Sequence, residues 1–330
     1  MRLLHRCLPI ALTLLLLLSG CGMKPEPAAP AKLKVGIMLS DSGLGDQSFN
    51  DAAFAGLTKS RDELSIEFDY RELSGTGTYE QGLQELIAER CDLVVGLGFT
   101  IKESLEKIAK AHPQQPFLLI DESSELPNVA SLTFKEEEGS FLVGLIAGLK
   151  TQTQSVGFIG GIDAPIIHKF GQGFAAGVKA ANPKAKVVID YAGDFGNAQL
   201  GSQIAGKMVE GSNADIIFAA AGFTGVGMLQ EQQKRGKMAI GVDSDQFFMA
   251  EKAVITSMLK NIDTAIYAAI KTFAEKRAFP EKLLVFGLKE NGVGMSPLHL
   301  VSLTPQEASK IDKLKQQLLD GSLSIPAGRP

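Results

Sequence analysis

The segment from Asp41 to Asn50, with the sequence DSGLGDQSFN, places two carboxylates, an aromatic ring and an amide within ten residues. Carboxylates accept hydrogen bonds from hydroxyl groups, the amide of Asn50 both donates and accepts, and the ring of Phe49 offers a flat apolar face. This combination suits a neutral ligand that carries several hydroxyl groups and has a flat face. The segment follows the apolar run LKVGIML, so we expect it where a buried strand ends.

The same loop has other interpretations. A phosphate-binding loop would need a Walker lysine, which the segment lacks, and Asp41 and Asp46 would repel an anion. A calcium loop could use the same carboxylates, but the EF-hand spacing with its bidentate glutamate is absent. A plain turn, in which Asp46 or Ser48 caps a helix that begins near Phe49, stays open as an alternative to ligand binding.

Short apolar runs alternate with segments of helical period along the rest of the chain, which is typical of β-α units around parallel sheets. The predicted strands are KVGIML, IEFDY, DLVVGLG, PFLLID, VASLTF, SVGFIG, KVVIDY, ADIIFAAA, MAIGVD and VITSML. The helices predicted between them include 79–90, 101–111, 199–210 and 262–276. Because the strands are apolar throughout, we expect burial on both faces and a doubly wound α/β fold.

Two pairs of segments recur in the same order in the two halves of the chain. DLVVGLGFT, a helix and PFLLID in the first half match DIIFAAAGFT, a helix and AIGVD in the second half. KVGIML followed by FNDAAFAGL at Phe49 likewise parallels SVGFIGG followed by FGQGFAAGV at Phe170. This repetition indicates an internal duplication, with repeats that cover about 32–134 and 136–254.

Polar residues and glycines stand at the ends of several predicted strands. In parallel sheets, ligands gather beyond the carboxyl ends of the strands. The two repeats could therefore face each other across one cleft. The strand-end residues that we expect to meet there are Asp41, Gly98, Asp121, Gly222 and Asp243.

The first 32 residues differ in composition from the rest. A charged start, MRLLHRC, precedes an apolar core over 8–18 that is too short to span a bilayer comfortably, so we predict a signal peptide over 1–20. LSGC, ending at Cys21, resembles a lipobox, in which the cysteine thiol carries a diacylglyceryl group. The Pro/Ala-rich residues 21–32 are then a tether. An ordinary export signal with a chance cysteine is the alternative.

Beyond the predicted tether the chain has one cysteine, Cys91, so a disulfide framework is excluded. Cys91 stands at the start of a predicted strand, where we expect a buried structural thiol. The net charge of −4 is mild and favours neither nucleic acid nor an anionic membrane surface as partner. The roughly 300 residues after the tether suffice for two lobes.

Several segments together resemble the BMP/PnrA family of basic membrane lipoproteins. They are VGIMLSDSGLGDQSFNDAAFAGL, EEEGSFLVGLIAGL, IGGIDAPIIHKFGQGFAAGV, AAGFTGVG, AIGVDSDQ and VITSMLKNIDTAIYAAI. The resemblance implies a substrate-binding component of an ABC importer with a two-lobed type I periplasmic-binding-protein fold. It implies an N-terminal lobe of 32–134 plus about 260–292, a C-terminal lobe of 136–258 plus about 293–330, and a hinge. A nucleoside, often a purine nucleoside, would be captured between the lobes.

The resemblance also implies roles for individual residues. Phe49 would stack on one face of the base, and Phe218 or Phe223 beside Gly222 on the other face. Asp121 would meet the base edge. The ribose hydroxyls would be bound by Asp41, Asn50, Asp243 and Lys260. The opening loop is one residue shorter here than in common versions of the family.

Each of these residues has a structural alternative. Phe218 lies in an apolar strand and could belong to the core, Asp243 could cap a following turn, and Lys260 could be a solvated cation. His168 and His299 are isolated, so we expect no role in binding for either.

An enzyme is the less favoured hypothesis. Hydrolysis of a nucleoside would need clustered carboxylates that hold a metal and water, and phosphorolysis would need cationic phosphate ligands. We therefore expect no catalytic residues, no metal and no cofactor. The expected partners are a nucleoside, the permease and ATPase of an ABC transporter, and the outer side of a bacterial cell membrane through the N-terminal lipid. A sensor that presents its ligand to a receptor would keep the same fold.

Overall fold

The computed structural model describes residues 32–325 and contains two sheets of six strands each. The first sheet consists of β1 (Lys34–Met38), β2 (Glu67–Arg71), β3 (Leu93–Leu97), β4 (Phe117–Ile120), β5 (Val129–Phe134) and β11 (Leu283–Phe286). The second consists of β6 (Ser155–Gly160), β7 (Lys186–Tyr191), β8 (Ile216–Ala220), β9 (Met238–Asp243), β10 (Val254–Lys260) and β12 (Val293–Met295). All pairs are parallel except β10 with β12. The predicted strands are all present, whereas β11 and β12 are too short to give a sequence signal.

The two sheets have the same strand order, β11-β5-β4-β3-β1-β2 in the first and β12-β10-β9-β8-β6-β7 in the second. The matched segments of the sequence occupy equivalent strands, namely β1 and β6, β3 and β8, and β4 and β9. The duplication inferred from the sequence is therefore present in the topology.

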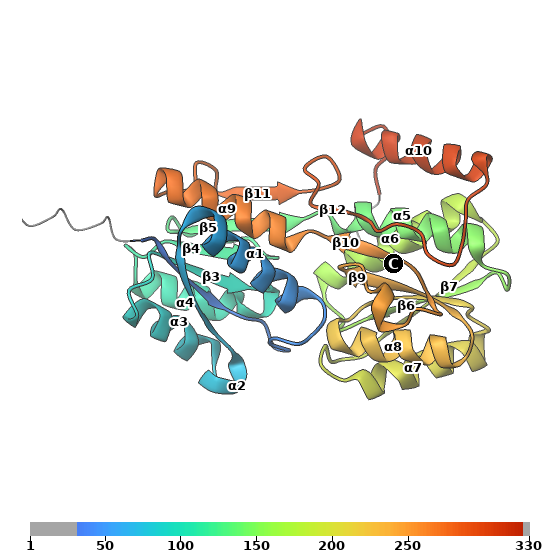
Figure 1. Ribbon diagram of the computed structural model, residues 1–330, viewed down its shortest axis with the longest axis horizontal. Helices are drawn as coiled ribbons and strands as arrows, with labels where there is room; N and C mark the ends of the chain where they lie inside the picture. Colours follow the sequence, from blue (N-terminus) through green and yellow to red (C-terminus); the bar gives the residue numbers. More distant parts are fainter. Residues whose placement is uncertain (1–31, 326–330) are drawn as a thin grey trace, which may run out of the picture. The chain divides into compact units, whose positions relative to one another are not determined.

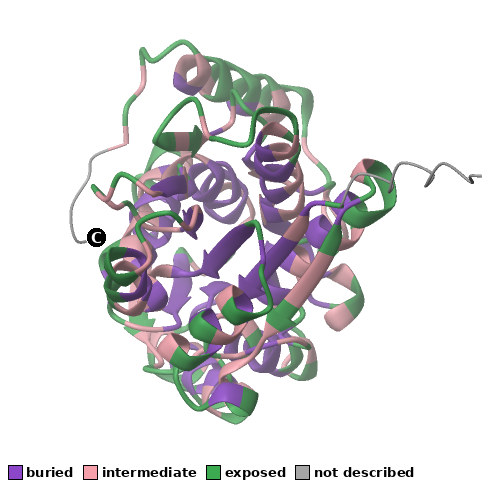
Figure 2. Ribbon diagram, turned by 90° about the vertical axis from the view of Figure 1, so that its left-hand side faces the viewer, coloured by how far each residue is buried: buried purple, intermediate pink, exposed green. Residues whose placement is uncertain are grey.

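Burial of the strands depends on their place in the sheet. The central strands β3, β4 and β8 are buried along their whole length, as predicted. Figure 2 faces the half formed by the first sheet and shows buried strands in its interior. The expectation of burial on both faces is wrong for β2 and β7, which consist of exposed and half-buried residues. Both are edge strands, so one of their sides has no neighbouring strand to exclude water.

Helices cover both faces of each sheet (Figure 1). They are α1 (Phe49–Leu64), α2 (Leu73–Thr76), α3 (Tyr79–Ala88), α4 (Lys102–Ala111), α5 (Glu136–Lys150), α6 (Pro165–Ala181), α7 (Ala198–Ser212), α8 (Gly222–Lys234), α9 (Ile262–Lys276) and α10 (Pro305–Leu319), with short 3₁₀ helices η1 (Phe99–Ile101) and η2 (Phe247–Met249). Neighbouring residues on a strand face opposite layers. Ile37 packs in the core that contains residues of α1 and α9, whereas Met38 packs in the core that contains residues of α3 and α4.

In the described residues the chain passes between the sheets three times, after β5, after β10 and after β11. Backbone hydrogen bonds join these crossings, because Lys135 N donates to Phe286 O at 3.0 Å and Asn261 N donates to Gly292 O at 2.8 Å. The segments after β10 divide between the sheets, since α9 packs on α1 while β12 pairs with β10. The residue boundaries of the two lobes stay a prediction.

Two sequence-based expectations concern the N-terminal end. The predicted signal peptide, Cys21 and all but the last residue of the predicted tether lie outside the described residues. Within 32–325, no helix has the length and apolar character needed to cross a membrane.

Helices α5 and α6 cross so closely that glycine is required at the contact. A Cβ atom added to Gly177 would lie 2.1 Å from the carbonyl oxygen of Phe141, and one added to Gly144 would lie 2.3 Å from that of Phe174. Both distances are far below van der Waals contact with rigid backbone atoms, so the helices could accept a side chain here only by moving apart.

We expect G177A to lower the free energy of unfolding by about 1–3 kcal/mol, because overpacking forces the two backbones to separate. G211A is the matched control, since Gly211 is an exposed residue of α7 with open space around its Cβ position. Alanine there should raise the free energy of unfolding by roughly 0.5–1 kcal/mol through helix propensity. Urea unfolding followed by circular dichroism measures both, and equal stability of the two variants would contradict the packing argument.

Candidate functional site

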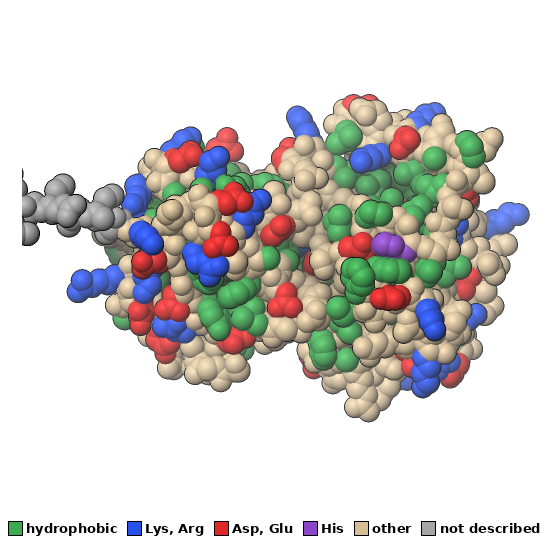
Figure 3. Space-filling view, in the orientation of Figure 1, with side chains coloured by type: hydrophobic (Ala, Val, Ile, Leu, Met, Phe, Trp, Pro, Cys, Tyr) green, Lys and Arg blue, Asp and Glu red, His purple; other side chains and the backbone are tan. Residues whose placement is uncertain are grey.

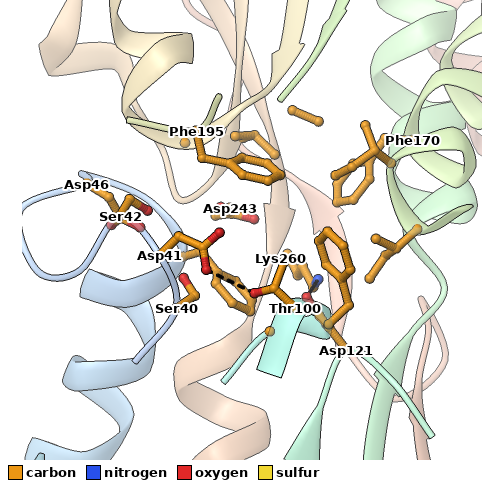
Figure 4. A pocket seen from close by; sticks show the side chains of 18 residues that line it. Ser40, Asp41, Ser42, Asp46, Thr100, Asp121, Phe170, Phe195, Asp243 and Lys260 are labelled. Carbon is orange, nitrogen blue, oxygen red and sulfur yellow. Dashed lines mark hydrogen bonds and ion pairs between the residues drawn. The ribbon is translucent and has the colours of Figure 1, made fainter. Parts of the chain in front are cut away.

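The carboxyl ends of strands from both sheets meet at one cavity, whose empty volume of about 640 Å³ includes its mouth (Figure 4). From the first-sheet side it is lined by Ser40, Asp41, Ser42, Asp46, Phe49, Gly98, Phe99, Thr100 and Asp121. From the second-sheet side it is lined by Ile166, Ile167, Phe170, Phe195, Ala220, Gly222, Val242, Asp243 and Lys260. All five strand-end residues that the sequence suggested would meet are therefore on its wall.

The backbone at these strand ends is left-handed in both repeats. Asp121 after β4 has φ 70° and Asp243 at the end of β9 has φ 65°, and the equivalent glycines Gly98 and Gly222 have φ 95° and 54°. An L-residue in this region costs roughly 1–2 kcal/mol, a cost that proteins tend to bear at functional sites. A Cβ on Gly98 would also approach the ring of Phe49 at 3.6 Å and Ser40 Cβ at 3.2 Å, so glycine is needed there.

Asp46 organises the opening loop. Its carboxylate accepts hydrogen bonds from the backbone N–H groups of Ser48 at 3.0 Å, Asn50 at 2.8 Å and Asp51 at 3.2 Å. Asp46 therefore caps α1, as the sequence allowed, while also lining the cavity. Burial raises its pKa and the bonds from Asn50 and Ser48 oppose that rise.

Asn50 does not line the cavity, so its predicted place among the ribose ligands is not supported by the structure. Its side chain is fully buried within the loop. Oδ1 accepts from Ser40 N at 2.9 Å and from Ser40 Oγ at 3.1 Å, and Nδ2 donates to Asp46 at 2.8 Å. The amide of Asn50 thus joins the loop to Ser40, two residues after the end of β1. These hydrogen bonds are needed because polar groups of the loop are buried and must find partners within the protein.

Asp41 stands at the exposed rim of the cavity. Its Oδ1 accepts hydrogen bonds from Thr100 Oγ1 at 3.0 Å and from the hydroxyl of Tyr79. Tyr79 and Thr100 are themselves 3.0 Å apart. The carboxylate is thus oriented by two hydroxyl groups from α3 and η1, the latter bond being drawn in Figure 4.

Lys260 is a buried cation rather than a solvated one, with its side chain 2% exposed. Its Nζ lies 2.6 Å from Asp121 Oδ2 and 3.1 Å from Glu136 Oε1, and 5.1 Å from the ring centre of Phe49. Burial lowers the pKa of Lys260, but the surrounding carboxylates outweigh burial and the pKa lies above its ordinary value. The ammonium therefore stays charged and ties the end of β10 to the end of β4.

Asp121 and Asp243 are carboxylates with strongly perturbed pKa values. Burial raises the pKa of each to about 6, although the charge of Lys260 works in the opposite direction. Asp121 Oδ1 has no hydrogen-bond partner and is buried at the cavity wall. Asp243 Oδ2 accepts a hydrogen bond from Ser48 Oγ. Both carboxylates therefore retain capacity to accept hydrogen bonds from a ligand that enters the cavity.

Two hydrogen bonds join the opening loop to the end of β9. Besides the bond between Ser48 and Asp243, Gln246 Nε2 donates to Gln47 O at 2.9 Å. Gln246 is in turn fixed because its Oε1 accepts from Val242 N at 2.9 Å. The two sides of the cavity are thus in direct contact in this conformation.

Aromatic rings line the cavity from both sides, but the second-sheet rings are not those that the sequence suggested. Phe170 and Phe195 lie opposite Ser40, Asp41 and Thr100 (Figure 4). The remaining rings on the wall belong to Phe49 and Phe99.

Neither Phe218 nor Phe223 lines the cavity, which corrects the expectation that one of them provides the second stacking face. Phe218 is fully buried, with its ring centre 5.5 Å from that of Phe158 and 5.4 Å from that of Phe174. It lies two residues before the end of β8, and Ala220 at that end reaches the wall instead. Phe223 sits in the first turn of α8 and is 38% exposed, because the helix turns its side chain outward.

Some of the missed residues had a signal in the sequence. Phe170 stands in the segment that matches the one around Phe49, so the repeat itself pointed to a second ring. Phe99 and Thr100 belong to the repeated GFT. Phe195 lies in a loop after β7 and had no such signal.

The two histidines that stand alone in the sequence, His168 and His299, do not line the cavity. His168 contacts Asp163 at 2.6 Å, and His299 contacts Asp245 at 3.0 Å and stacks on Phe247.

Cys91 is buried, as predicted, and burial raises the pKa of its thiol to about 11. Within the described residues no group of three His, Cys, Asp or Glu side chains is placed to hold a metal ion. On the face seen in Figure 3, acidic and basic side chains are interspersed over the half formed by the first sheet.

Residues 33–328 match the family described as ABC transporter substrate-binding protein PnrA-like. A CD4+ T-cell-stimulating antigen from Listeria monocytogenes is 32% identical over 94% of both chains. The ABC transporter nucleoside-binding protein BmpA of Lactococcus lactis is 28% identical over 96% of this chain and 97% of its own length. A solute-binding protein of an ABC transporter system from Aeropyrum pernix superposes with a TM-score of 0.81 at 27% identity, covering 90% of this chain and 94% of that one. The type I periplasmic-binding-protein fold expected from the sequence is confirmed.

We expect the stability of D243N relative to wild type to rise with pH. The pKa of Asp243 is raised from 3.8 to about 6 on folding, so the wild-type carboxyl favours folding below about pH 4 and this contribution is lost as the pH rises through about 6. Asparagine does not ionise and still accepts from Ser48. Between about pH 4 and pH 7.5 the variant should gain roughly 2–3 kcal/mol relative to wild type.

Urea unfolding at both pH values measures this difference. D62N is the control for the loss of one negative charge, because Asp62 lies on the surface with its side chain 58% exposed. If D243N and wild type differ in their free energy of unfolding by the same amount at both pH values, burial does not raise the pKa of Asp243 as described.

Proposed function

Because the chain belongs to the PnrA-like family of ABC transporter substrate-binding proteins, we propose that it is the lipid-anchored binding component of an importer that captures a nucleoside, with preference for purine nucleosides. The observation that carries this proposal is the cavity wall, which combines aromatic rings and buried carboxylates from both sheets. The Lactococcus relative is described as nucleoside-binding, which supports the same ligand class. The family and the Aeropyrum neighbour are both described as binding proteins of ABC transporters, so we propose binding without catalysis.

The two kinds of lining residue match the two parts of a nucleoside. Phe49 on one side and Phe170 or Phe195 on the other offer apolar faces for a planar base, and the larger purine ring gains more from stacking. The carboxylates of Asp121 and Asp243 can accept more hydrogen bonds than the donors of the protein supply. Ribose hydroxyls or base N–H groups can donate the remaining hydrogen bonds. Lys260 has a third N–H that can donate to a hydroxyl oxygen.

The charge of the wall selects a neutral ligand. Of the residues that line the cavity, Asp41, Asp46, Asp121 and Asp243 are acidic and Lys260 is the one basic residue. Its charge is already shared between Asp121 and Glu136. A phosphate group would therefore meet net negative charge, so a nucleotide should bind far more weakly than the nucleoside.

The transport role adds partners that the cavity does not show. Substrate-binding proteins of ABC importers deliver the ligand to a permease that is coupled to an ATPase. A lipid on Cys21 would hold the protein at the outer side of the cell membrane, and relatives in Borreliella are named basic membrane proteins. The tether of residues 21–32 would link this anchor to β1.

We expect F49A and D243A each to weaken adenosine binding about 10- to 100-fold. F49A removes a stacking face worth about 1–3 kcal/mol per base, so it should narrow the preference for adenosine over cytidine. D243A removes charge-assisted hydrogen bonds to ribose, so it should narrow the preference for adenosine over adenine. Isothermal titration calorimetry with these ligands, and with adenosine 5′-monophosphate as the charged control, measures all three preferences.

F218L is the matched control for the aromatic residues, because Phe218 lies in the core behind the cavity and leucine keeps the site apolar. Its adenosine affinity should stay within about twofold of wild type. Wild-type affinity in both F49A and D243A, with circular dichroism showing folded protein, would refute the nucleoside site. Tight binding of the monophosphate would refute selection by charge.

We expect C21S to lose its membrane anchor, since each buried methylene of an acyl chain contributes about 0.8 kcal/mol. The protein should then accumulate uncleaved or be released into the aqueous phase. Detergent phase partition combined with intact-mass measurement tests this. C7S is the control, because Cys7 falls in the part that would be removed. If C21S protein still partitions into detergent with a processed N-terminus, Cys21 is not the lipid attachment site.

A further inference from the structure

Glu136 is a fully buried carboxylate behind the cavity wall. It is the first residue of α5 and does not itself line the cavity. Its Oε1 lies 3.1 Å from Lys260 Nζ, and its Oε2 lies 3.3 Å from Lys169 Nζ on α6. Glu136 is not among the residues proposed to contact the ligand.

The ammonium of Lys260 lies between two carboxylates and engages Asp121 through one oxygen only. The distance from Nζ to Asp121 Oδ2 is 2.6 Å, while Asp121 Oδ1 is buried at the cavity wall without a hydrogen-bond partner. An ammonium paired with a single carboxylate is free to shift between its two oxygens. Here the second carboxylate, Glu136, attracts the ammonium from another direction.

We propose that Glu136 is a positioning residue for the ligand site: it holds Lys260 so that Asp121 Oδ1 stays free to accept a hydrogen bond from an N–H or O–H group of a neutral ligand. This inference rests on the proposed function, because it names the group that receives the ligand's donor. Glu136 acts through Lys260 and does not touch the ligand.

Glu136 and Lys260 lie on neighbouring crossings between the two sheets. Glu136 directly follows the first crossing between the sheets, and Lys260 directly precedes the second. Backbone hydrogen bonds join Lys135 to Phe286 and Asn261 to Gly292, so the third crossing is tied to both. The backbone segments that carry Glu136 and Lys260 are therefore held next to each other.

Charged groups from four elements face Asp121. They are Lys260 on β10, Glu136 on α5, Lys169 on α6 and Asp243 on β9. Burial is the main cause of the raised pKa of Asp121, the charge of Lys260 lowers that pKa, and the charge of Glu136 raises it. Removing the negative charge of Glu136 should consequently lower the pKa of Asp121 below its present value of about 6.

The test compares E136Q with E138Q. Glutamine keeps the size of the side chain and removes its charge. Glu138 is the control because it lies two residues farther along the same helix end and does not contact Lys260. Its carboxylate accepts a hydrogen bond from Leu288 N at 2.8 Å. Carbon-13 NMR titration of the Asp121 carboxyl in the ligand-free protein, assigned with D121N, measures its pKa. Calorimetry with adenosine measures affinity.

We expect E136Q to lower the pKa of Asp121 and to weaken adenosine binding about tenfold, because the ammonium then shifts onto both oxygens of Asp121. E138Q should change neither quantity. E136D keeps the charge but draws it back by one methylene, so it should weaken binding while leaving the pKa of Asp121 close to the wild-type value. If E136Q does not fold, the adenosine affinity of E136D tests the positioning role.

Unchanged affinity in E136Q and E136D, or equal losses in E136Q and E138Q, would overturn the positioning role. So would an Asp121 pKa that E136Q does not lower. A wild-type protein that fails to bind adenosine would instead refute the proposed function, and the NMR titration would still decide whether Glu136 acts on Asp121.

Discussion

The ammonium of Lys260 is the one buried cation among the described residues, and three carboxylates act on it, those of Asp121, Glu136 and Asp243. A buried charge is tolerated only when it is paired, so the ends of β4, β9 and β10 and the start of α5 must meet at this place. Asp121 and Glu136 contact the ammonium directly, Asp243 acts on it from farther away, and Asp46 adds a further negative charge next to Asp243. The relative placement of the two sheets at the cavity depends on this cluster.

The negative charges of the cluster exceed its positive charge, and this excess determines which ligands the cavity favours. The raised pKa values of Asp121 and Asp243 mean that ionisation of these groups is costly in the folded protein. Donors from a ligand would reduce that cost, whereas an anion would increase it. The same excess of negative charge therefore lowers the free energy of unfolding and makes the site selective for neutral molecules that carry hydroxyl groups. Binding sites commonly show this trade-off between stability and function.

The duplication explains how such a site is built. Each repeat places a glycine and an aspartate in left-handed conformation at equivalent strand ends, Gly98 with Asp121 and Gly222 with Asp243. Two copies of one local geometry, facing each other, give a cavity with acceptors on both sides. The repeats have diverged in their loops, since the first carries a loop tied together by Asp46 and Asn50, and the second contributes the rings of Phe170 and Phe195.

The strands other than β11 and β12, the duplicated order and the strand-end residues that meet at the cavity could be predicted from the sequence, because apolar periodicity and repeated motifs are local signals. The sequence did not decide which polar and aromatic side chains face the cavity. Asn50 and Phe218 have suitable chemistry but are used inside the fold, the first by hydrogen bonds to Ser40 and Asp46 and the second by packing against Phe158 and Phe174. Glu136 and Phe195 reach the site through contacts between distant segments. Side-chain direction near a strand end, and the pairing of buried charges from different elements, are fixed only when the sheets pack, so no local sequence pattern reveals them.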